Sequence, residues 1–351
     1  MSQTSEQVRV GFIGAGAICE QRHLPNLATR NDTEIVAVCN RTAESGKRIA
    51  DKWNISDVLA DWKELVARPD IDAVFIGTWP YTHAEMAVAA LQAKKHVFCQ
   101  ARMAANLEQA RAMLDAADNN PELVDMICPP PHRMPFEPYI KHVLQTKQLG
   151  DIWEVRVVCR NASDVGPLNW RQRIEYSGQQ IMQIGIWAEV LHALVGEYRE
   201  LSVKFAIPIS EKPDPQSPGN TYRIDIPQVV SIAGVLKSGV VITEDHSAVA
   251  AGENQNHITI TGSDGALRFN AYGDLQIAKP ASDTFFTVDV PDQYVRDWQA
   301  EDDFINAIHL SREGVPSIDW GISPDFSEGM KYMKKMDAIH RAARHGKVVM
   351  V

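Results

Sequence analysis

The segment VRVGFIGAGAIC at residues 8–19 joins an apolar run to a glycine-rich turn. Residues 8–13 predict a buried strand, and the turn that follows leads directly into a helix. This order places backbone N–H groups at a helix N-terminus, where they bind the pyrophosphate of a dinucleotide. The third position of the motif is Cys19 rather than Gly or Ala, so the prediction depends on the strand–turn–helix context. We expect the contacts at Gly14, Gly16, Ala17 and Ile18.

Strands and helices alternate over the first third of the chain. The pattern predicts strands at 34–39, 73–77, 96–99 and 123–128, and helices at 43–53, 83–93 and 106–119. Alternating elements of this kind form right-handed crossovers and a doubly wound parallel sheet. The triple proline at 129–131 then breaks the pattern. We therefore expect an α/β Rossmann domain over residues 1–128.

The remaining residues, 129–351, have a different character. They contain strand-like segments at 152–160, 201–207, 228–235, 240–246, 257–261 and 266–270, with helices expected at 179–195, 300–313 and 326–345. Runs of strands with segregated helices predict an α+β domain on a large, mostly antiparallel open sheet. Residues 212–219, rich in Pro, Asp and Ser, predict a surface loop. We expect this domain to bind the substrate and to mediate oligomerisation.

Composition limits the function classes. The chain of 351 residues has a net charge of −10 and a pI near 5.6, which argues against nucleic acid or an anionic membrane as the main partner. No apolar run reaches the length of a spanning helix, and the N-terminus does not resemble a secretion signal. The five cysteines show no metal-ligand spacing, so we expect no metal and reduced thiols in a cytoplasmic protein.

The residues after the second strand bear on which dinucleotide is bound. NAD-specific sites usually have Asp or Glu there for the ribose 2′-OH, whereas an arginine suits the 2′-phosphate of NADP. The sequence has Asn40, Arg41 and Thr42. With no carboxylate to repel a phosphate, Arg41 favours NADP over NAD, and the alternative is that Arg41 is a solvated loop residue.

Motifs spread over nearly the whole chain resemble the Gfo/Idh/MocA oxidoreductase family, whose members mostly act on sugars, polyols and related compounds. The resemblance implies that the segments after the expected strands at 73–77 and 96–99 contribute to the cofactor site. The residues are Thr78, Trp79, His83 and Gln100, although His83 also suits a structural role. The matching segments, in order, are Gly14-Ala15-Gly16 with His23-Leu24-Pro25, Thr78 with His83, Lys95–Cys99, Gly150-Asp151-Ile152, Trp170-Arg171, and Gly185.

Three departures from the family pattern fall where its catalytic residues are expected. The family's Glu-Lys-Pro is Gln100-Ala101-Arg102 here, and its Asp-x-Gly-x-x-x-His has Gln183 and Trp187 at the acidic and imidazole positions. Oxidation of an alcohol needs a positioned base for the hydroxyl proton. Alanine, glutamine and tryptophan cannot titrate, and arginine stays protonated. The reaction therefore cannot be transferred directly from the family.

Other residues are candidates for this site. His132, after the triple proline, and Tyr176 are the catalytic candidates, whereas His192 is about 140° around its helix from position 187. Arginine forks suit carboxylates and phosphates, and tryptophan suits ring faces. The alternatives are that Trp187 packs in the core and that the arginines are solvated. The substrate-binding candidates are Arg102, Arg133, Trp170, Arg171, Gln183 and Trp187.

Three functions are consistent with these residues. The first is an NAD(P)-dependent oxidoreductase on a sugar-like or cyclic small molecule, one that carries an anionic or aromatic group. The second is an enzyme that keeps NAD(P) bound and uses transient hydride transfer for elimination, hydrolysis or isomerisation. The third is a non-catalytic NAD(P)-binding subunit or sensor. In each case the resemblance implies a homodimer or homotetramer formed through the open sheet of the second domain.

Overall fold

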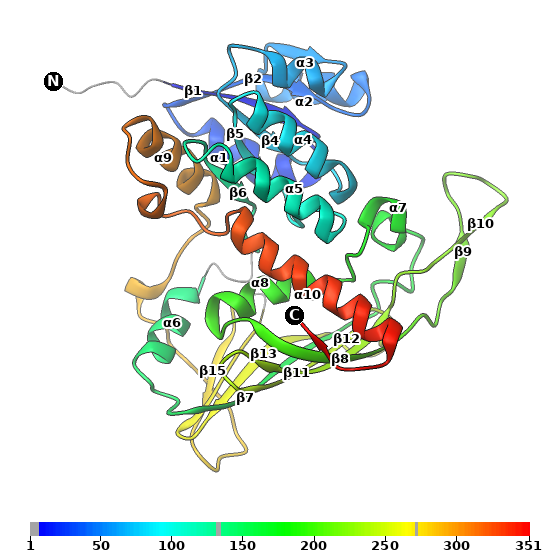
Figure 1. The fold of residues 1–351 in the computed structure, drawn as a ribbon, viewed down its shortest axis with the longest axis vertical. Helices are drawn as coiled ribbons and strands as arrows, with labels where there is room; N and C mark the ends of the chain where they lie inside the picture. The colour runs from blue at the N-terminus through cyan, green and yellow to red at the C-terminus, as the bar shows by residue number, and fades with distance from the viewer. Residues whose placement is uncertain (1–6, 131–134, 271–272) are drawn as a thin grey trace. The chain divides into compact units, whose positions relative to one another are not determined.

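The computed structural model describes residues 7–130, 135–270 and 273–351, and Figure 1 labels its helices and strands. These residues form two compact units. The first comprises the chain up to Pro129 together with Gln299–Met330, and the second comprises Pro130–Trp298 and Lys331–Val351. A division into residues 1–128 and 129–351 did not anticipate that the segment 299–330 returns to the first unit.

The first unit contains a six-stranded parallel sheet, which confirms the predicted Rossmann-type fold. Its strand order is β3-β2-β1-β4-β5-β6, so the order reverses beside β1, where ligands bind in sheets of this type. The short strand β3 was not predicted because three residues are too few to show a strand pattern. The strands are β1 (Val8–Ile13), β2 (Thr33–Cys39), β3 (Asp57–Leu59), β4 (Ala73–Ile76), β5 (His96–Cys99) and β6 (Asp125–Ile127).

Some helices of the first unit begin at recognisable side-chain caps. The Thr42 hydroxyl accepts the Ser45 N–H, and the Asn106 side chain accepts the Gln109 N–H at 2.9 Å. Gln109 in turn accepts the Ala105 N–H at 3.1 Å, so its side chain also satisfies a backbone donor at the start of this helix. The helices are α1 (Leu24–Ala28), α2 (Ala43–Trp53), α3 (Trp62–Ala67), α4 (Pro80–Gln92), α5 (Leu107–Asp118) and α9 (Ala300–Arg312).

The return of α9 to the first unit has a packing cause. Phe304 is fully buried and meets Phe75 and Phe98 edge-on, with ring centroids 5.3 and 5.5 Å away. Those two rings stack on each other at 4.5 Å. Aromatic contacts of this geometry add to the free energy gained from burying the rings. The helix is therefore part of the core of the first unit.

The second unit contains a nine-stranded, mostly antiparallel sheet, as predicted. Its order is β16-β15-β14-β13-β7-β12-β11-β8-β17, and within this sheet β7 and β12 pair in parallel. A separate hairpin is formed by β9 and β10. The strands are β7 (Ile152–Arg160), β8 (Tyr198–Ala206), β9 (Glu211–Pro213), β10 (Thr221–Arg223), β11 (Val229–Leu236), β12 (Val241–Ser247), β13 (Gln255–Gly262), β14 (Gly265–Asn270), β15 (Leu275–Ala278), β16 (Phe286–Thr287) and β17 (Val349–Met350).

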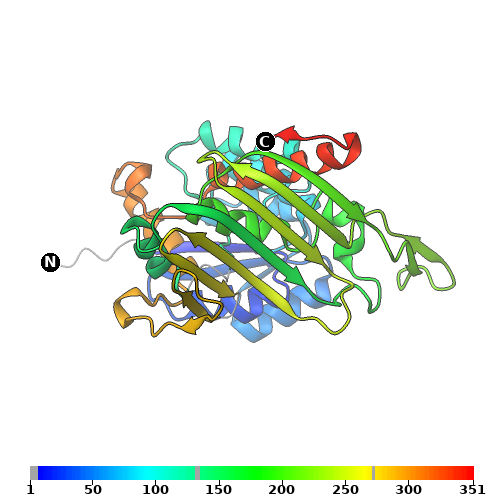
Figure 2. The same ribbon diagram turned by 90° about the horizontal axis from the view of Figure 1, so that it is seen from below.

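One face of this sheet packs against helices and the other does not. Apolar residues of α6 (Glu137–Gln145), α8 (Ile184–Leu194) and α10 (Phe326–His345) join the inward side chains of the central strands in one core. Figure 2 shows the strands uncovered on the opposite face. The sequence predicted that this helix begins at residue 179. In the structure α8 begins at Ile184, and Gln183 is its N-cap.

Most of the expected surface loop at 212–219 is confirmed as the connection between β9 and β10, whereas Lys212 and Pro213 belong to β9. Lys212 is buried, and its ammonium donates to the Gly166 carbonyl at 2.6 Å, to Gln172 Oε1 at 3.1 Å and to the Asp164 carbonyl. The prediction of a loop was wrong at this lysine because three oxygen acceptors from a distant segment satisfy its charge. Such long-range partners leave no signal in the local sequence.

Candidate active site

The glycine turn after β1 has the geometry of a phosphate cradle. Gly14 has φ +79°, and a Cβ there would lie 2.5 Å from Thr78 Cγ2, so the fold itself requires glycine. Gly16 is different: it is exposed, and an added Cβ would meet nothing nearer than the Gly14 carbonyl oxygen at 3.9 Å. The fold does not require a glycine at position 16. Its missing side chain leaves the turn backbone open to a ligand.

The helix that follows the turn is held close to the sheet. Cys19 is buried, and a Cβ on Gly77 would lie 2.4 Å from its sulfur. Cys19 therefore takes the part that a third glycine or alanine plays in this motif, which is close packing of the helix on a neighbouring strand end. Burial raises the pKa of the Cys19 thiol to about 12, so the thiol is unreactive. Ala17 and Ile18, before it, are exposed and half-buried.

The two residues after β2 have separate tasks. Asn40 Oδ1 accepts the Ala15 N–H at 2.7 Å, so this side chain braces the glycine turn. Arg41 is exposed, and its guanidinium carbon lies 5.7 Å from the centre of the Trp79 ring, within the range of a cation–π contact. Among the predicted cofactor residues, the structure thus brings Asn40 to the turn and Arg41 to Trp79.

His83 is a structural clamp in this arrangement. The ring is fully buried, with Nε2 at 3.0 Å from the Thr78 carbonyl oxygen and Nδ1 at 2.9 Å from that of Arg102. Burial lowers the pKa of His83. The ring ties the loop after β4 to the loop after β5. This position favours the structural alternative that the sequence left open for His83.

A buried polar chain supports Gln100 at the end of β5. His23 Nε2 lies 2.8 Å from Gln100 Oε1, and His23 Nδ1 donates to the Glu301 carboxylate. Burial opposes ionisation of Glu301, but the hydrogen bonds from His23 and Asn26 outweigh it and lower its pKa. Sequence reasoning missed Glu301, because it lies 278 residues from His23. Arg102, two residues beyond Gln100, is buried at 6% exposure.

Two of the predicted site residues, His132 and Arg133, lie outside the described residues. Three others lie together in the second unit, on the segment 169–177. Arg171 is exposed, with its guanidinium carbon 4.5 Å from the centre of the Trp170 ring. Tyr176, on α7 (Ile174–Ser177), donates from its hydroxyl to Gln216 Oε1 at 3.2 Å. This hydrogen bond ties Tyr176 to the β9–β10 hairpin.

Gln183 and Trp187 lie at the start of α8, facing the sheet. Trp187 is fully buried in the core of the second unit, as the packing alternative for this residue expected. Both side chains meet Cys159 on β7: its thiol lies 3.9 Å from Gln183 Oε1, and the Trp187 side chain lies beside it. The two positions where the family pattern has its acid and imidazole are therefore grouped around one strand residue, Cys159.

A row of polar residues crosses the inward face of the sheet at this point. In the strand register, Cys159 pairs with His246 of β12 on one side and with Asn256 of β13 on the other. Among the described residues, His246 Nδ1 and Asn256 Oδ1 have no hydrogen-bond partner, and both atoms are shielded from solvent. Buried polar atoms without partners are rare and call for an explanation. The alternation Glu244-x-His246 on a strand was the available sequence signal.

Behind this row lies a buried ion pair. Glu244 Oε1 accepts Lys335 Nζ at 2.5 Å and the Tyr198 hydroxyl, and Glu244 Oε2 lies 2.8 Å from His246 Nε2. Burial opposes ionisation of Glu244, but the Lys335 ammonium and His246 hold its pKa below the usual range. All four side chains are fully buried. A buried charge persists only where it is paired in this way.

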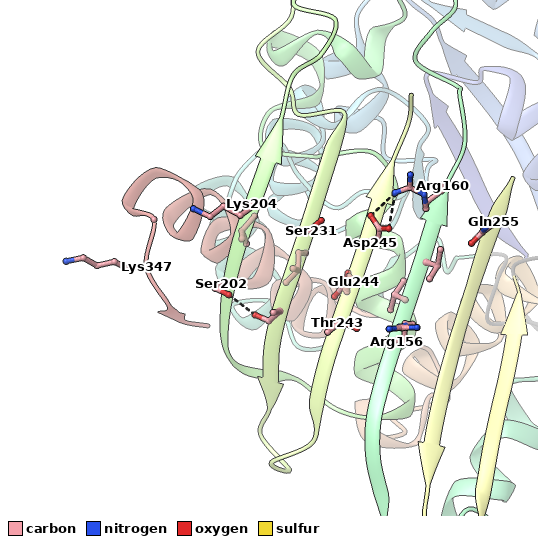
Figure 3. Close-up of a pocket in the computed structure, with 16 residues that line it drawn as sticks. Arg156, Arg160, Ser202, Lys204, Ser231, Thr243, Glu244, Asp245, Gln255 and Lys347 are labelled. Carbon is pink, nitrogen blue, oxygen red and sulfur yellow. Dashed lines mark hydrogen bonds and ion pairs between the residues drawn. The ribbon is translucent and has the colours of Figure 1, made fainter. Parts of the chain in front are cut away.

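The uncovered face of the sheet carries a shallow groove of about 690 Å³. Figure 3 shows short side chains such as Ser202, Ser231 and Thr243 along it, with Arg160 bonded to Asp245. Lys204 and Lys347 lie at one side. Short side chains and charges of both signs therefore line this uncovered face.

Two family models match the chain and together cover more than two thirds of it. The oxidoreductase family model with an NAD-binding Rossmann fold matches residues 8–127, and the GFO/IDH/MocA C-terminal domain matches residues 139–268. The chain belongs to the GFO/IDH/MocA family. The family resemblance seen in the sequence is confirmed, and with it the assignment of the chain to the NAD-binding oxidoreductases.

Relatives in the GFO/IDH/MocA family include enzymes named for sugars and polyols. Levoglucosan dehydrogenase of Pseudarthrobacter phenanthrenivorans is 27% identical over 306 residues, which is 78% of this chain and 76% of that protein. Inositol 2-dehydrogenase of Klebsiella pneumoniae is 26% identical over 88% of each chain. A levoglucosan dehydrogenase structure in complex with NADH and L-sorbose superposes with a TM-score of 0.84 at 24% identity. The superposition covers 98% of this chain and 99% of that chain.

The structure of this GFO/IDH/MocA protein also bears on membrane spans, metal sites and cysteines. Within residues 7–130, 135–270 and 273–351, no helix is both long and apolar enough to cross a membrane. The same residues contain no group of three or more His, Cys, Asp or Glu side chains arranged to hold a metal ion. All five cysteines are buried free thiols.

Proposed function

We propose that this protein is a nicotinamide-dinucleotide-dependent oxidoreductase that acts on a sugar-like or cyclic small molecule. The observation that carries the proposal is the open turn at Gly16, where nothing in the fold calls for a glycine and a side chain would cover the turn backbone. Membership of the oxidoreductase family supports it. The dinucleotide supplies a hydride acceptor or donor when it is bound.

The residues around the turn fit a dinucleotide. Gly14, Gly16, Ala17 and Ile18 present backbone at a helix start, which suits the pyrophosphate. Asn40 holds the turn in shape through the Ala15 N–H. Thr78, Trp79 and Gln100 follow β4 and β5, at the carboxyl ends of the strands where ligands bind in such sheets.

We propose NADP as the preferred dinucleotide over NAD. Asn40 is committed to the turn and the next two residues are Arg41 and Thr42, so Arg41 is the residue available at the ribose 2′ position. An exposed guanidinium next to the face of Trp79 offers a planar fork for a phosphate and a ring for the adenine. A clear preference for NADH in binding would refute this assignment.

The substrate class is inferred from the relatives and from the replaced positions. Levoglucosan and inositol, in the names of two relatives, are cyclic polyols. Ala101, Gln183 and Trp187 replace the ionisable residues of the family pattern, whereas Arg102, Arg133, Trp170 and Arg171 add cations and an aromatic face. We therefore propose a cyclic substrate that carries an anionic or aromatic group.

A non-catalytic role in dinucleotide binding is the second candidate. The observation that favours it is the complete burial of Trp187, which removes that position from any substrate. An enzyme that keeps NAD(P) bound and borrows its hydride transiently is the third candidate. It predicts that NAD(P) remains on the purified protein and that no free NAD(P)H accumulates during turnover.

One experiment separates these three functions. NADPH and NADH are titrated by fluorescence, and a panel of levoglucosan, myo-inositol, D-glucuronate and an aromatic glucoside is then tested for NAD(P)H formation and for other products. Net NAD(P)H formation supports the oxidoreductase. Product without net NAD(P)H supports transient hydride transfer, and dinucleotide binding with no product from any compound supports the non-catalytic role.

We also propose that the protein is a homodimer or homotetramer in a reducing compartment, the cytoplasm. The uncovered sheet face with charges of both signs suits an isologous contact, in which each patch meets its own copy. Five free, buried cysteines support the compartment. Light scattering of the purified chain gives the number of subunits.

A further inference from the structure

The uncovered face of the second unit's sheet has another hollow, over the strands β7, β13, β14 and β15. Its volume is about 540 Å³, which is within the range of sites that hold small molecules. The loop 279–285 after β15 forms one wall, and its Phe285 ring lies against Arg268 of β14, 3.9 Å from the guanidinium carbon. None of the described lining residues is a candidate site residue. This hollow is called the β13 groove below.

Two arginines and a histidine share the floor of the β13 groove. In the strand register Thr259 of β13 pairs with Arg156 of β7 on one side and with Arg268 of β14 on the other. Side chains paired across neighbouring strands lie on the same face, and the strands are about 4.8 Å apart. His257 is two positions before Thr259, so it shares this face. The row thus places two guanidinium groups and an imidazole around one small space.

The positive charge of this row is not balanced by carboxylates. Among the described residues that line the β13 groove, Glu154 is the only acid. Neither Arg156 nor Arg268 forms an ion pair with a described residue. Burial, and then the charges of Arg268 and Arg156, lower the pKa of His257. Cations left unpaired on a chain with a net charge of −10 attract an anion from solution.

Arg268 is held in place before any ligand binds. Its Nε donates to Thr259 Oγ1 at 3.2 Å, and Phe285 covers one side of the guanidinium group. These contacts leave the two terminal nitrogens of Arg268 without a partner among the described residues. Because Thr259 Oγ1 accepts this hydrogen bond, its own proton is free for another acceptor. Donors that are already ordered lose little conformational entropy when a ligand binds.

The arrangement of donors suits a phosphoryl group. A phosphoryl group has three terminal acceptor oxygens, which match the two guanidinium forks and the hydroxyl group of Thr259 between them. A carboxylate has two oxygens and leaves one of these donors unused. The groove extends beyond the row to Trp153, which is 61% exposed and offers a ring face to the rest of a ligand.

We propose that the β13 groove binds the phosphoryl group of a small molecule through Arg156, Thr259 and Arg268, with His257 as a further N–H donor. This site goes beyond the proposed function and does not depend on it. The donors lie to one side of the proposed subunit contact, because Ala233 at its centre is on β11 and β12 and β7 separate β11 from β13. Arg156 is at the boundary, since it lines both grooves.

The first test measures the affinity for inorganic phosphate by calorimetry, with chloride at equal ionic strength as the blank. The titrations use the Gly16→Val background, because the open glycine turn is a second place where phosphate binds. We expect saturable binding that weakens about tenfold or more in Arg156→Gln and in Arg268→Gln, the cost of one hydrogen-bonded charge. Lys204→Gln is the matched control, since Lys204 is an exposed cation on β8 that lines the other groove of the same face.

The second test locates the bound phosphate directly. In protein labelled with ¹⁵N-arginine, we expect the Nε signals of Arg156 and Arg268 to shift on addition of phosphate and the other arginine signals to stay in place. The two glutamine variants assign these signals. Arg268→Lys keeps the charge and loses the fork, so it should bind phosphate more weakly than the parent protein. Urea denaturation of each variant checks that it remains folded, and the exposed Arg156 supplies a variant that leaves the core unchanged.

A comparison of compounds tests the ligand class. Glucose 6-phosphate should bind at least as tightly as inorganic phosphate, citrate more weakly, and glucose not at all. The proposal is overturned if phosphate does not saturate, if both glutamine variants bind it like the parent protein, or if citrate binds more tightly than phosphate. Loss of phosphate binding in Ala233→Arg assigns the site to a contact between two copies and overturns a site formed by one chain.

Discussion

Asn40 Oδ1 accepts a hydrogen bond from the Ala15 N–H at 2.7 Å, so the residue that follows β2 shapes the glycine turn that follows β1. The turn is therefore braced before any ligand arrives. We expect Asn40→Ala to weaken NADPH binding by about 1–2 kcal/mol, or about 5- to 30-fold in Kd, because a buried donor loses its acceptor. Fluorescence titration measures the change. Asn40→Asp keeps the acceptor, so its NADH affinity should stay near the wild-type value.

The two glycines of the turn should respond differently to substitution. Gly14→Ala places a Cβ 2.5 Å from Thr78 Cγ2 at φ +79°, and we expect it to lower the free energy of unfolding by about 1–3 kcal/mol. Gly16→Val meets no such clash and should unfold like the wild type while losing saturable dinucleotide binding. Thermal unfolding and titration of both variants check this. Undiminished NADPH binding by Gly16→Val would remove the turn from the cofactor site.

Arg41 should set the choice between the two dinucleotides. In Arg41→Ala we expect NADPH affinity to fall about tenfold or more, the cost of one hydrogen-bonded charge on a phosphate, while NADH affinity stays the same. The control is Lys47→Ala, since Lys47 is an exposed cation on α2 that pairs with Asp51. An equal loss for both dinucleotides in Arg41→Ala contradicts a contact with the 2′-phosphate.

Protonation of His96 should contribute a loss of stability in mild acid. This ring is nearly buried and its Nδ1 accepts the Val124 N–H at 2.9 Å, and burial lowers its pKa to about 4. Between pH 6.5 and 4 the unfolded chain binds the proton and the folded chain does not, so the stabilisation is present above pH 6.5 and is lost as the pH falls toward 4. We expect a loss of about 2–3 kcal/mol from this group.

Urea denaturation at pH 7 and pH 5 measures that loss. His96→Gln should reduce the difference between the two pH values, although it starts from a lower stability at pH 7. His345→Gln, at an exposed position in the last turn of α10, should keep the wild-type dependence. A pH dependence that is identical in all three proteins contradicts the assignment to His96.

The uncovered sheet face should control the number of subunits. Ala233 on β11 is exposed there, and Ala233→Arg adds a long charged side chain in the middle of the proposed contact. We expect a monomer by light scattering at concentrations where the wild type associates. Ala112→Arg, at an exposed position on α5, is the matched control and should associate like the wild type. Unchanged association of Ala233→Arg places the contact elsewhere.

Much of the fold could be predicted because its signals are local. The strand before Gly14, the helix start at residue 106 and the triple proline each depend on residues within a few positions of one another. The short strand β3 and the buried Lys212 were missed for the opposite reason. Lys212 has its acceptors at Gly166 and Gln172, forty or more residues away, and local composition indicated a loop.

The candidate site divides in the same way. The cofactor turn was visible in the sequence because Gly14 and Gly16 follow a strand directly. Glu244, His246 and Lys335 were missed, since the sequence shows a lysine 91 residues after a glutamate and only the β12 and α10 packing brings the two together. The burial of Trp187 was an open alternative that periodicity alone could not resolve. An apolar face of a helix can pack in a core or line a ligand-binding site, and the sequence pattern is the same in both cases.

The return of α9 to the first unit has a consequence for synthesis of the chain. Phe304 completes the aromatic stack on β4 and β5, and Glu301 completes the chain to His23 and Gln100. When only residues 1–129 have emerged from the ribosome, the apolar surface of the sheet that α9 covers in the complete protein is therefore still exposed. The nucleotide-binding half becomes fully native only after the whole second unit up to Trp298 has emerged, so the N-terminal half of this protein finishes folding late.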